Sequence, residues 1–235
     1  MSRINLAILA SGSGTTAEAF VRHSMNMLNR PYDVSLVICN NPNAGVFDRV
    51  ARLNEQLGTS IEALHISSGT HPVGADEDPT PGGQTIAEQE AILHELNNRG
   101  ISCVVLMGYM KKVGELLVTE YGWLPAYTSM YQARMLNTHP GLLPSTKGLF
   151  GRFVQAAVLK NGAEEAGQTL HLVAADYDDG PVVAENRISI KPDDTPDTLF
   201  KRIQMVEKER IADDVTKFIR DQEEYQRSHN SSPAQ

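Results

Sequence analysis

The chain has 235 residues, of which 41% are hydrophobic and 21% charged, proportions close to those of an ordinary globular protein. A formal net charge of −8 argues against a general nucleic-acid-binding role, because phosphate binding needs a concentrated basic surface. No apolar run approaches the roughly 18 to 20 residues of a membrane span, and Cys39 and Cys103 lie inside apolar runs, which indicates buried, reduced thiols and a cytoplasmic location.

The first half of the chain alternates short apolar runs with helical segments. Apolar runs separated by helices of roughly 10 to 15 residues favour parallel strands joined by right-handed crossovers. We therefore predict an α/β fold with a single doubly wound, mostly parallel sheet. The strands are expected at Ile4–Leu9, Val34–Cys39, Ile61–Ile66 and Ser102–Met107, and the helices at Thr15–Leu28, Val46–Leu57 and Thr85–Asn98.

The pattern changes in the last quarter of the chain. Pro181–Ile190 alternates like a strand with one wet face, which predicts an antiparallel edge, and Asp197–Phe218 is typical of a long helix. We expect one domain over residues 1–219. The polar segment 220–235 lacks an apolar stripe and is predicted to be a frayed tail.

A long loop is predicted between the third strand and the helix that follows it. Ser67–Gln84 contains four glycines, three prolines and an acidic cluster. Loops of this length without secondary structure are uncommon in compact domains, so this one is expected to be functional or mobile.

The first strand runs into a glycine loop. Residues Gly12 to Ala17 (GSGTTA) fit the pattern G-x-G-x-x-G/A before a helix, where exposed N–H groups and the helix dipole hold an anion. A dinucleotide site also needs an acid after the second strand, but Cys39 is followed there by two asparagines. A phosphate monoester is favoured, with a dinucleotide site or a structural turn as alternatives.

Two polar side chains follow an apolar step before Pro140. Asn137 and His139 are two residues apart, so on an extended segment they point to the same side. An amide and an imidazole placed together can both face a developing oxyanion. The alternative is a turn in which both side chains bond only to local backbone.

A second polar segment follows the apolar run at Leu170–Ala175. Three carboxylates, Asp176, Asp178 and Asp179, lie within four positions, and their repulsion would raise the pKa of one of them enough for it to act as a base near neutrality. A solvated acidic turn or a cation site is the alternative. His171 lies between leucines, which favours a structural role for it.

Taken together, these motifs resemble the folate-dependent formyltransferases. The resemblance runs from about Ile4 to Ile219 and is strongest to members that formylate the amine of glycinamide ribonucleotide in purine biosynthesis. N-x-H-P-x-L-L-P followed by H-x₆-D-x-G-P is specific as a pair. The motifs are SGSGTT, MGYMKK, NTHPGLLP and HLVAADYDDGP.

The resemblance implies a set of roles for residues of this chain. It implies that Asn137 and His139 stabilise the formyl oxygen and that Asp178 governs proton transfer. It implies two binding regions, with substrate phosphate and ribose at Gly14, Thr15, Thr16, Gln204 and Glu207, and folate at Met110, Lys111, Lys112, Val113, Ala174, Ala175, Asp176 and Tyr177. The family usually has Asn where this chain has Thr16.

The implied reaction is attack of the substrate amine on the formyl carbon of 10-formyltetrahydrofolate, the cosubstrate. No metal is expected, because the histidines show no ligand spacing. The expected partners are small molecules, with no nucleic acid and no membrane, and the chain is expected to be a monomer or a homodimer.

The sequence departs from the family pattern in three places. The loop at 67–84 is longer than usual, an insertion at 121–134 holds the only tryptophan and three tyrosines, and residues 149–154 lack the usual histidines. We expect all three near the substrates. The aromatic insertion would act as a lid or an interface patch, or would simply pack against the core, and packing is slightly favoured.

These departures keep other functions open. The acceptor could be another amine, such as an amino-sugar nucleotide or methionyl-tRNA, although the tRNA reaction would call for an added basic domain. A hydrolase would release formate with the same three side chains. A non-catalytic folate or nucleotide-binding module is the remaining alternative, but binding alone does not need all three.

Overall fold

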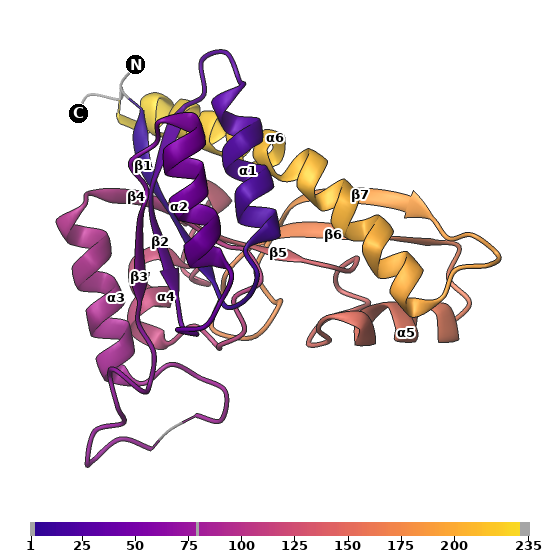
Figure 1. Cartoon of the computed structure of the whole chain (residues 1–235), viewed down its shortest axis with the longest axis horizontal. Helices are drawn as coiled ribbons and strands as arrows, with labels where there is room; N and C mark the ends of the chain where they lie inside the picture. Colours follow the sequence, from indigo (N-terminus) through magenta and orange to yellow (C-terminus); the bar gives the residue numbers. More distant parts are fainter. Residues whose placement is uncertain (1–2, 79, 231–235) are drawn as a thin grey trace.

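The described residues form a seven-stranded sheet with helices on both faces (Figure 1). A computed structural model describes residues 3–78 and 80–230. The strand order is β3-β2-β1-β4-β5-β6-β7, in which β1 to β5 run parallel while β6 and β7 are each antiparallel to the strand before them. The predicted doubly wound sheet with an antiparallel edge is confirmed.

The elements follow one another in the predicted alternation. The N-terminal part contains β1 Ile4–Ala10, α1 Thr15–Met25, β2 Tyr32–Cys39, α2 Val46–Leu57, β3 Glu62–His65, α3 Ile86–Asn98 and β4 Ile101–Leu106. The C-terminal part contains α4 Glu115–Tyr121, the 3₁₀ turn η1 Met130–Gln132, β5 Met135–His139, α5 Arg152–Lys160, β6 Glu165–Leu172, β7 Val182–Ser189 and α6 Pro196–Asn230.

Local chemistry explains several boundaries. At the start of α3, the Thr85 hydroxyl accepts a hydrogen bond from the Glu88 N–H at 3.0 Å, and the Glu88 carboxylate accepts one from the Thr85 N–H at 2.7 Å. Helix α2 ends at Leu57, and the Gly58 that follows has a φ of +64°, which suits glycine. Helix α1 ends before the predicted Leu28, because the chain turns there and Asn29 adopts a φ of +59°.

The core lies on both faces of the sheet. Leu6 and Ile8 of β1 pack with residues of α1, α2 and α6, whereas Ala7 and Leu9 pack with residues of α3 and α4. All four side chains are fully buried, as expected for a central strand covered on both faces. The helices cover the two faces of the sheet, and the carboxyl ends of the parallel strands are where ligands bind in sheets of this kind.

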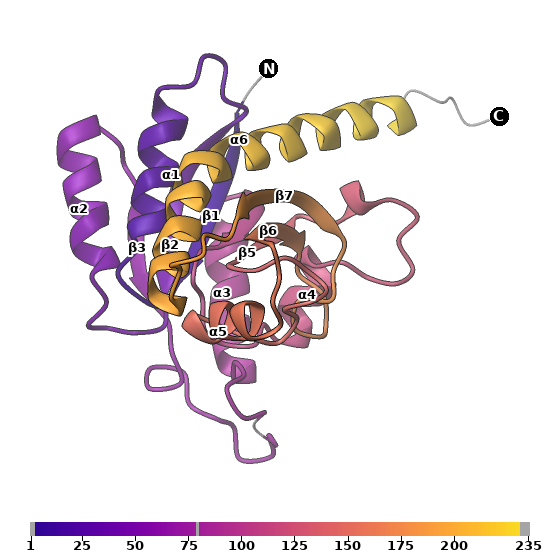
Figure 2. The same cartoon turned by 90° about the vertical axis from the view of Figure 1, so that its right-hand side faces the viewer.

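The predicted frayed tail is wrong for residues 220–230, because α6 continues to Asn230 (Figure 2). The side-chain amide of Gln222 donates to the carbonyl oxygens of Tyr131 and Ala133 at 2.9 and 2.8 Å, and the Tyr131 ring packs against Phe218 and Tyr225. These contacts come from a segment about 90 residues earlier in the chain. Residues 231–235 lie outside the described residues.

The two long insertions lie outside the cavity described below. The aromatic segment 121–134 precedes β5 and packs against α6, as the packing interpretation predicts. It contributes no residue to the lining of the cavity, although the Trp123 N–H donates to the carbonyl oxygen of Val173, which does line it. The described residues of 67–84 form a loop, as predicted. This loop braces the segment after β4, since the side-chain amide of Gln84 bonds to the Tyr109 hydroxyl and accepts from the Gly114 N–H.

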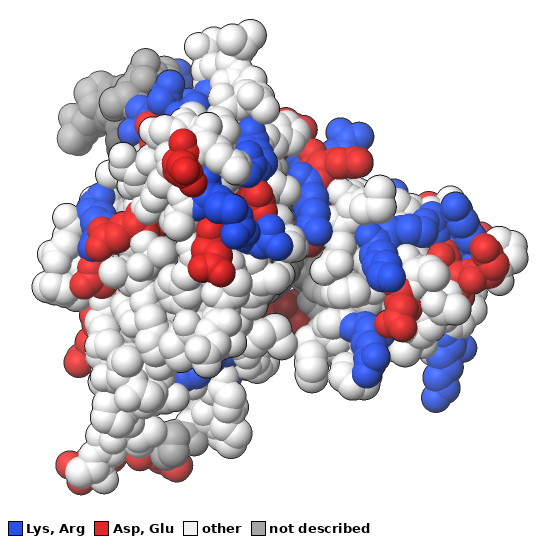
Figure 3. Space-filling view, in the orientation of Figure 1, with Lys and Arg blue, Asp and Glu red and all other residues white. Residues whose placement is uncertain are grey.

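Charged side chains of both signs are interspersed on the surface, as the face in Figure 3 shows. Glu18 of α1, for example, pairs with Arg22 and with Arg49 of α2. Among the described helices, none is long and apolar enough to cross a membrane.

Candidate active site

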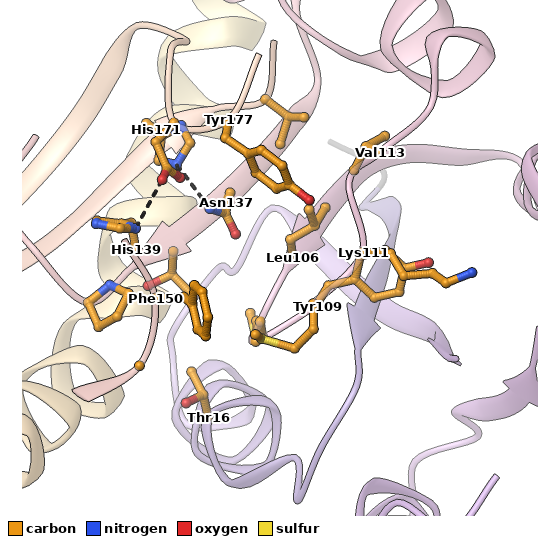
Figure 4. A pocket seen from close by; sticks show the side chains of 18 of the residues that line it. Thr16, Leu106, Tyr109, Lys111, Val113, Asn137, His139, Phe150, His171 and Tyr177 are labelled. Carbon is orange, nitrogen blue, oxygen red and sulfur yellow. Dashed lines mark hydrogen bonds and ion pairs between the residues drawn. The ribbon is translucent and has the colours of Figure 1, made fainter. Parts of the chain in front are cut away.

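A cavity of about 560 Å³ opens at the carboxyl ends of the central strands (Figure 4). Its walls come from the loops after β1 and β4, the end of β5, the loops before α5 and after β6, and α6. Every site residue named from the sequence lines it: Asn137, His139, Asp178, Gly14, Thr15, Thr16, Gln204, Glu207, Met110, Lys111, Lys112, Val113, Ala174, Ala175, Asp176 and Tyr177.

A polar cluster forms where β5 meets β6. The antiparallel register places Asn137 opposite His171, and the Asn137 side-chain nitrogen lies 3.0 Å from the His171 Nε2. The His171 Nδ1 lies 2.8 Å from the Leu172 carbonyl oxygen, which can only accept, so Nδ1 carries a proton. Asn137 and His171 therefore form one connected polar unit on the cavity wall.

Asp178 completes this cluster from the loop after β6. Its Oδ2 lies 3.5 Å from the His139 Nδ1, and its Oδ1 lies 3.4 Å from the His171 Nε2. The Gly148 N–H donates to Oδ2 at 3.0 Å. Asp178 has a φ of +52°, a left-handed conformation that aspartate and asparagine tolerate better than most residues.

The predicted rise in the pKa of one of the clustered aspartates is wrong for Asp178. Burial alone would raise the pKa of its carboxyl, but contacts with His171, His139 and the Gly148 N–H outweigh it and hold the pKa below its usual range. The neighbouring acids also meet cations, Asp176 facing Lys112 at 3.9 Å and Asp179 pairing with Lys147. Each of the three acids therefore has its own partner in the fold.

His139 is fixed within the cluster and is 4% exposed. Its Nε2 lies 3.0 Å from the Thr146 hydroxyl, on the loop before α5. Burial lowers the pKa of the imidazole, and this effect outweighs the opposing charge of Asp178. The imidazole is therefore held with one nitrogen toward a carboxylate and the other toward a hydroxyl.

The amino end of α1 forms another wall. Gly14 precedes the helix with a φ of +72°, and no side chain caps the first turn. The free N–H groups of that turn therefore face the cavity as an anion-binding site. A Cβ at Gly14 would lie 2.5 Å from the Val46 Cγ2 and 2.9 Å from the Val46 Cα, so this position requires glycine for space as well as for φ.

Helix α6 contributes Gln204 and Glu207, one turn apart. Glu207 is only 8% exposed, and its two oxygens accept from the Thr138 hydroxyl at 2.7 Å and the Thr16 hydroxyl at 3.2 Å. Burial raises the pKa of Glu207, and these two hydrogen bonds oppose that rise. Thr16 and Glu207, 191 positions apart, therefore meet at one wall of the cavity.

The two neighbouring lysines after β4 have different environments. The Lys111 ammonium lies 2.6 and 2.5 Å from the two carboxylate oxygens of Glu88, whose side chain is fully buried. The Lys112 ammonium is one-third exposed, and it lies 3.9 Å from Asp176 and 5.9 Å from the centre of the Tyr177 ring. Lys112 therefore joins the two loops at the cavity mouth, whereas Lys111 anchors its loop to α3.

Sequence reasoning missed some lining residues. His171 was expected to be structural, yet it contacts both Asn137 and Asp178; the same-face pairing of β5 with β6 was the signal that could have placed it there. Of the three departures, only 149–154 reaches the cavity. Phe150 lines the wall and packs edge-on against Phe153, with both rings 57% exposed.

Comparisons with known proteins agree with this arrangement. The fold and cavity are those of an α/β enzyme built on a doubly wound sheet. Residues 4–215 match the family model described as formyl transferase. The chain belongs to the formyl transferase family.

Three relatives illustrate the likeness. The chain is 35% identical to phosphoribosylglycinamide formyltransferase of Mycobacterium tuberculosis, over 86% of this chain and 79% of the relative. It is 29% identical to the protein of the same name from Bacillus subtilis, over 86% and 87%. A crystal structure of phosphoribosylglycinamide formyltransferase from Bacillus halodurans aligns with a TM-score of 0.72 and 31% identity, over 92% of this chain and 95% of that one.

Proposed function

We propose that this chain transfers the formyl group of 10-formyltetrahydrofolate to the amine of glycinamide ribonucleotide in purine biosynthesis. The observation that carries this proposal is the single cavity in which Asn137, His139 and Asp178 lie beside an uncapped helix end. The relatives named phosphoribosylglycinamide formyltransferase support the same acceptor. The first turn of α1 receives the phosphate, and Gln204 and Glu207 receive the ribose.

In the proposed reaction the acceptor nitrogen attacks the formyl carbon and forms a tetrahedral intermediate. The side chains of Asn137 and His139 line the part of the cavity where the oxyanion develops. An amine of this type has a pKa of about 7.7 to 8.0 and must lose a proton. Asp178 takes that proton, directly or through water, and returns it to the folate nitrogen as the carbon–nitrogen bond breaks.

The folate occupies the opposite wall, between the segment Met110–Val113 and the loop Ala174–Tyr177. The wall is partly apolar. At the mouth, Met110 is 57% exposed and Tyr177 is 50% exposed. Exposed apolar groups beside a cavity fit a planar aromatic ligand. Lys112 lies at the same mouth and suits the anionic end of the cosubstrate.

A transfer assay tests the proposal. Purified protein is incubated with 10-formyltetrahydrofolate and glycinamide ribonucleotide, and the deformylated folate and the formylated ribonucleotide are both quantified. Equal amounts of both products are expected. Folate release without the amine would instead indicate a hydrolase, and release only with other amines would indicate a different acceptor. No release with any amine would favour a binding module.

Asn137→Ala is expected to lower kcat by about 10²-fold with little change in either KM, because the lost amide donor acts on the oxyanion rather than on bound substrates. Steady-state kinetics with each substrate varied in turn measure this. A rise in KM at unchanged kcat would contradict the oxyanion role.

Gly14→Ala is expected to raise the KM for the ribonucleotide by at least about tenfold, because the new methyl group displaces the start of α1 from Val46. Gly162→Ala is the matched control, since Gly162 has a φ of +66° but an added Cβ there meets nothing within 4 Å. The control should cost about 1 kcal/mol of stability and leave both KM values unchanged. Equal kinetic behaviour of the two variants would contradict the prediction.

A further inference from the structure

A chain of side-chain hydrogen bonds runs from the cavity wall through the sheet to the outer part of α6. The Thr138 hydroxyl donates to the Glu207 Oε1 at 2.7 Å, and the Gln168 amide donates to the Thr138 oxygen at 2.9 Å. The Asn186 amide donates to the Gln168 Oε1 at 2.9 Å and to the Asp214 Oδ2 at 2.7 Å. Four elements, β5, β6, β7 and α6, are linked in this way.

The direction of donation in this series of hydrogen bonds follows from its end at Asp214. The Asn186 side-chain nitrogen donates one proton to the Asp214 carboxylate and the other to the Gln168 oxygen. The Gln168 nitrogen is then left to donate to Thr138, whose single proton can go only to Glu207. Each bond fixes the direction of the next.

The two oxygens of Glu207 accept hydrogen bonds of different length. Oε1 is bound at 2.7 Å by Thr138, which is 6% exposed and backed by the fully buried Gln168. Oε2 faces Thr16 at 3.2 Å, a long distance for a hydroxyl donor. Oε2 is therefore the oxygen with capacity for a further donor.

Thr138 lies between Asn137 and His139 in β5, so its side chain points to the opposite side of the strand from theirs. The strand thus carries the polar cluster on one side and binds the Glu207 carboxylate of α6 on the other. Loss of the Thr138 hydroxyl removes the hydrogen bond to Glu207 without removing a group from the polar cluster.

We propose that Thr138, Gln168 and Asn186 are positioning residues, which hold Glu207 as an acceptor for the ribose hydroxyls of the phosphoribosyl amine. This inference rests on the proposed function. It predicts a selective effect on the acceptor, because the chain of bonds ends at the acceptor wall and makes no contact with the folate wall.

Thr138→Val tests the inference, since it keeps the shape of the side chain and removes the hydroxyl. The KM for glycinamide ribonucleotide is expected to rise roughly tenfold or more, the usual effect of losing a hydrogen bond to a charged group, with kcat and the KM for 10-formyltetrahydrofolate within twofold of wild type. Thr138→Ser should restore the wild-type KM. Asn186→Leu, remote from the cavity, should raise the acceptor KM severalfold in the same selective way.

Thr216→Val is the matched control, because Thr216 is a buried threonine of α6 that does not line the cavity. It should leave both KM values unchanged. Calorimetric titration of each variant with glycinamide ribonucleotide alone gives the dissociation constant as a second readout. If Thr138→Val folds poorly, Thr138→Ser and Asn186→Leu still test the inference.

The outcomes separate this inference from the function on which it rests. A wild-type protein that neither binds nor formylates the ribonucleotide overturns both. A wild-type protein that formylates it, with an acceptor KM unchanged in Thr138→Val and Asn186→Leu, overturns the positioning role alone. A fall in kcat with equal changes in both KM values also overturns it, because that pattern indicates general disorder of the site.

Discussion

Asp178→Asn is expected to lower kcat for formyl transfer by about 10³-fold or more, because the variant cannot take the proton from the attacking amine. Asparagine is the suitable replacement for two reasons. It tolerates the left-handed φ of +52°, and its side-chain oxygen can still accept from the Gly148 N–H. The fold should therefore remain intact, and circular dichroism and the unfolding midpoint should match those of wild type.

Asp179→Asn is the matched control for this experiment. Asp179 is the adjacent acid, its side chain is half exposed and pairs with Lys147, and it does not line the cavity. Its activity should stay within a few-fold of wild type. Substantial turnover by Asp178→Asn, or equal losses in the two variants, would remove Asp178 from the proton-transfer step.

The same variant tests the electrostatics of the cluster. In the wild-type protein, burial lowers the pKa of His139 and the Asp178 carboxylate partly counteracts that fall. A neutral asparagine removes the counteracting charge, so the pKa of His139 should move further below its usual value of about 6.5. An NMR titration of the imidazole, assigned with His139→Ala, measures this pKa. A rise in the pKa would contradict the pairing of His139 with the Asp178 carboxylate.

Much of the fold was predictable because the signals are local. Helix α2 has the predicted bounds, since an amphipathic run there ends at a glycine, and α3 begins where Thr85 and Glu88 form a capping box. The end of α6 was not predictable. Its last turns lack an apolar stripe, and they are held by Gln222 through carbonyls from a segment far away in the sequence.

The candidate site shows the same division. Asn137 and His139 were predictable as a pair, because alternate residues of a strand share a side. The depressed pKa of Asp178 was not, since it depends on His171 from the neighbouring strand and on the Gly148 N–H from another loop. Composition alone pointed to three acids in mutual repulsion. Tertiary contacts with the two histidines and with a backbone N–H reverse the direction of the pKa shift.

Lys111→Met is expected to lower the free energy of unfolding by about 3 kcal/mol, because it leaves the carboxylate of Glu88 buried without its cation. The Glu88 side chain is fully buried, and both of its oxygens contact the Lys111 ammonium. Lys111 is itself 16% exposed, which places the effect at the lower end of the range for a broken buried ion pair. Urea unfolding followed by fluorescence of Trp123 measures the change.

Lys112→Met is the matched control, and the two variants should differ in kind. Lys112 is one-third exposed and its nearest carboxylate, on Asp176, is 3.9 Å away and largely in solvent, so the stability loss should stay below about 1 kcal/mol. Its loss should instead raise the KM for 10-formyltetrahydrofolate, increasingly so at low salt, because the freed position faces the anionic end of that ligand. Adjacent lysines of one motif would then serve separate purposes, one holding the loop to α3 and one meeting the cosubstrate. Equal stability losses in the two variants would contradict that division, and so would an unchanged KM in Lys112→Met.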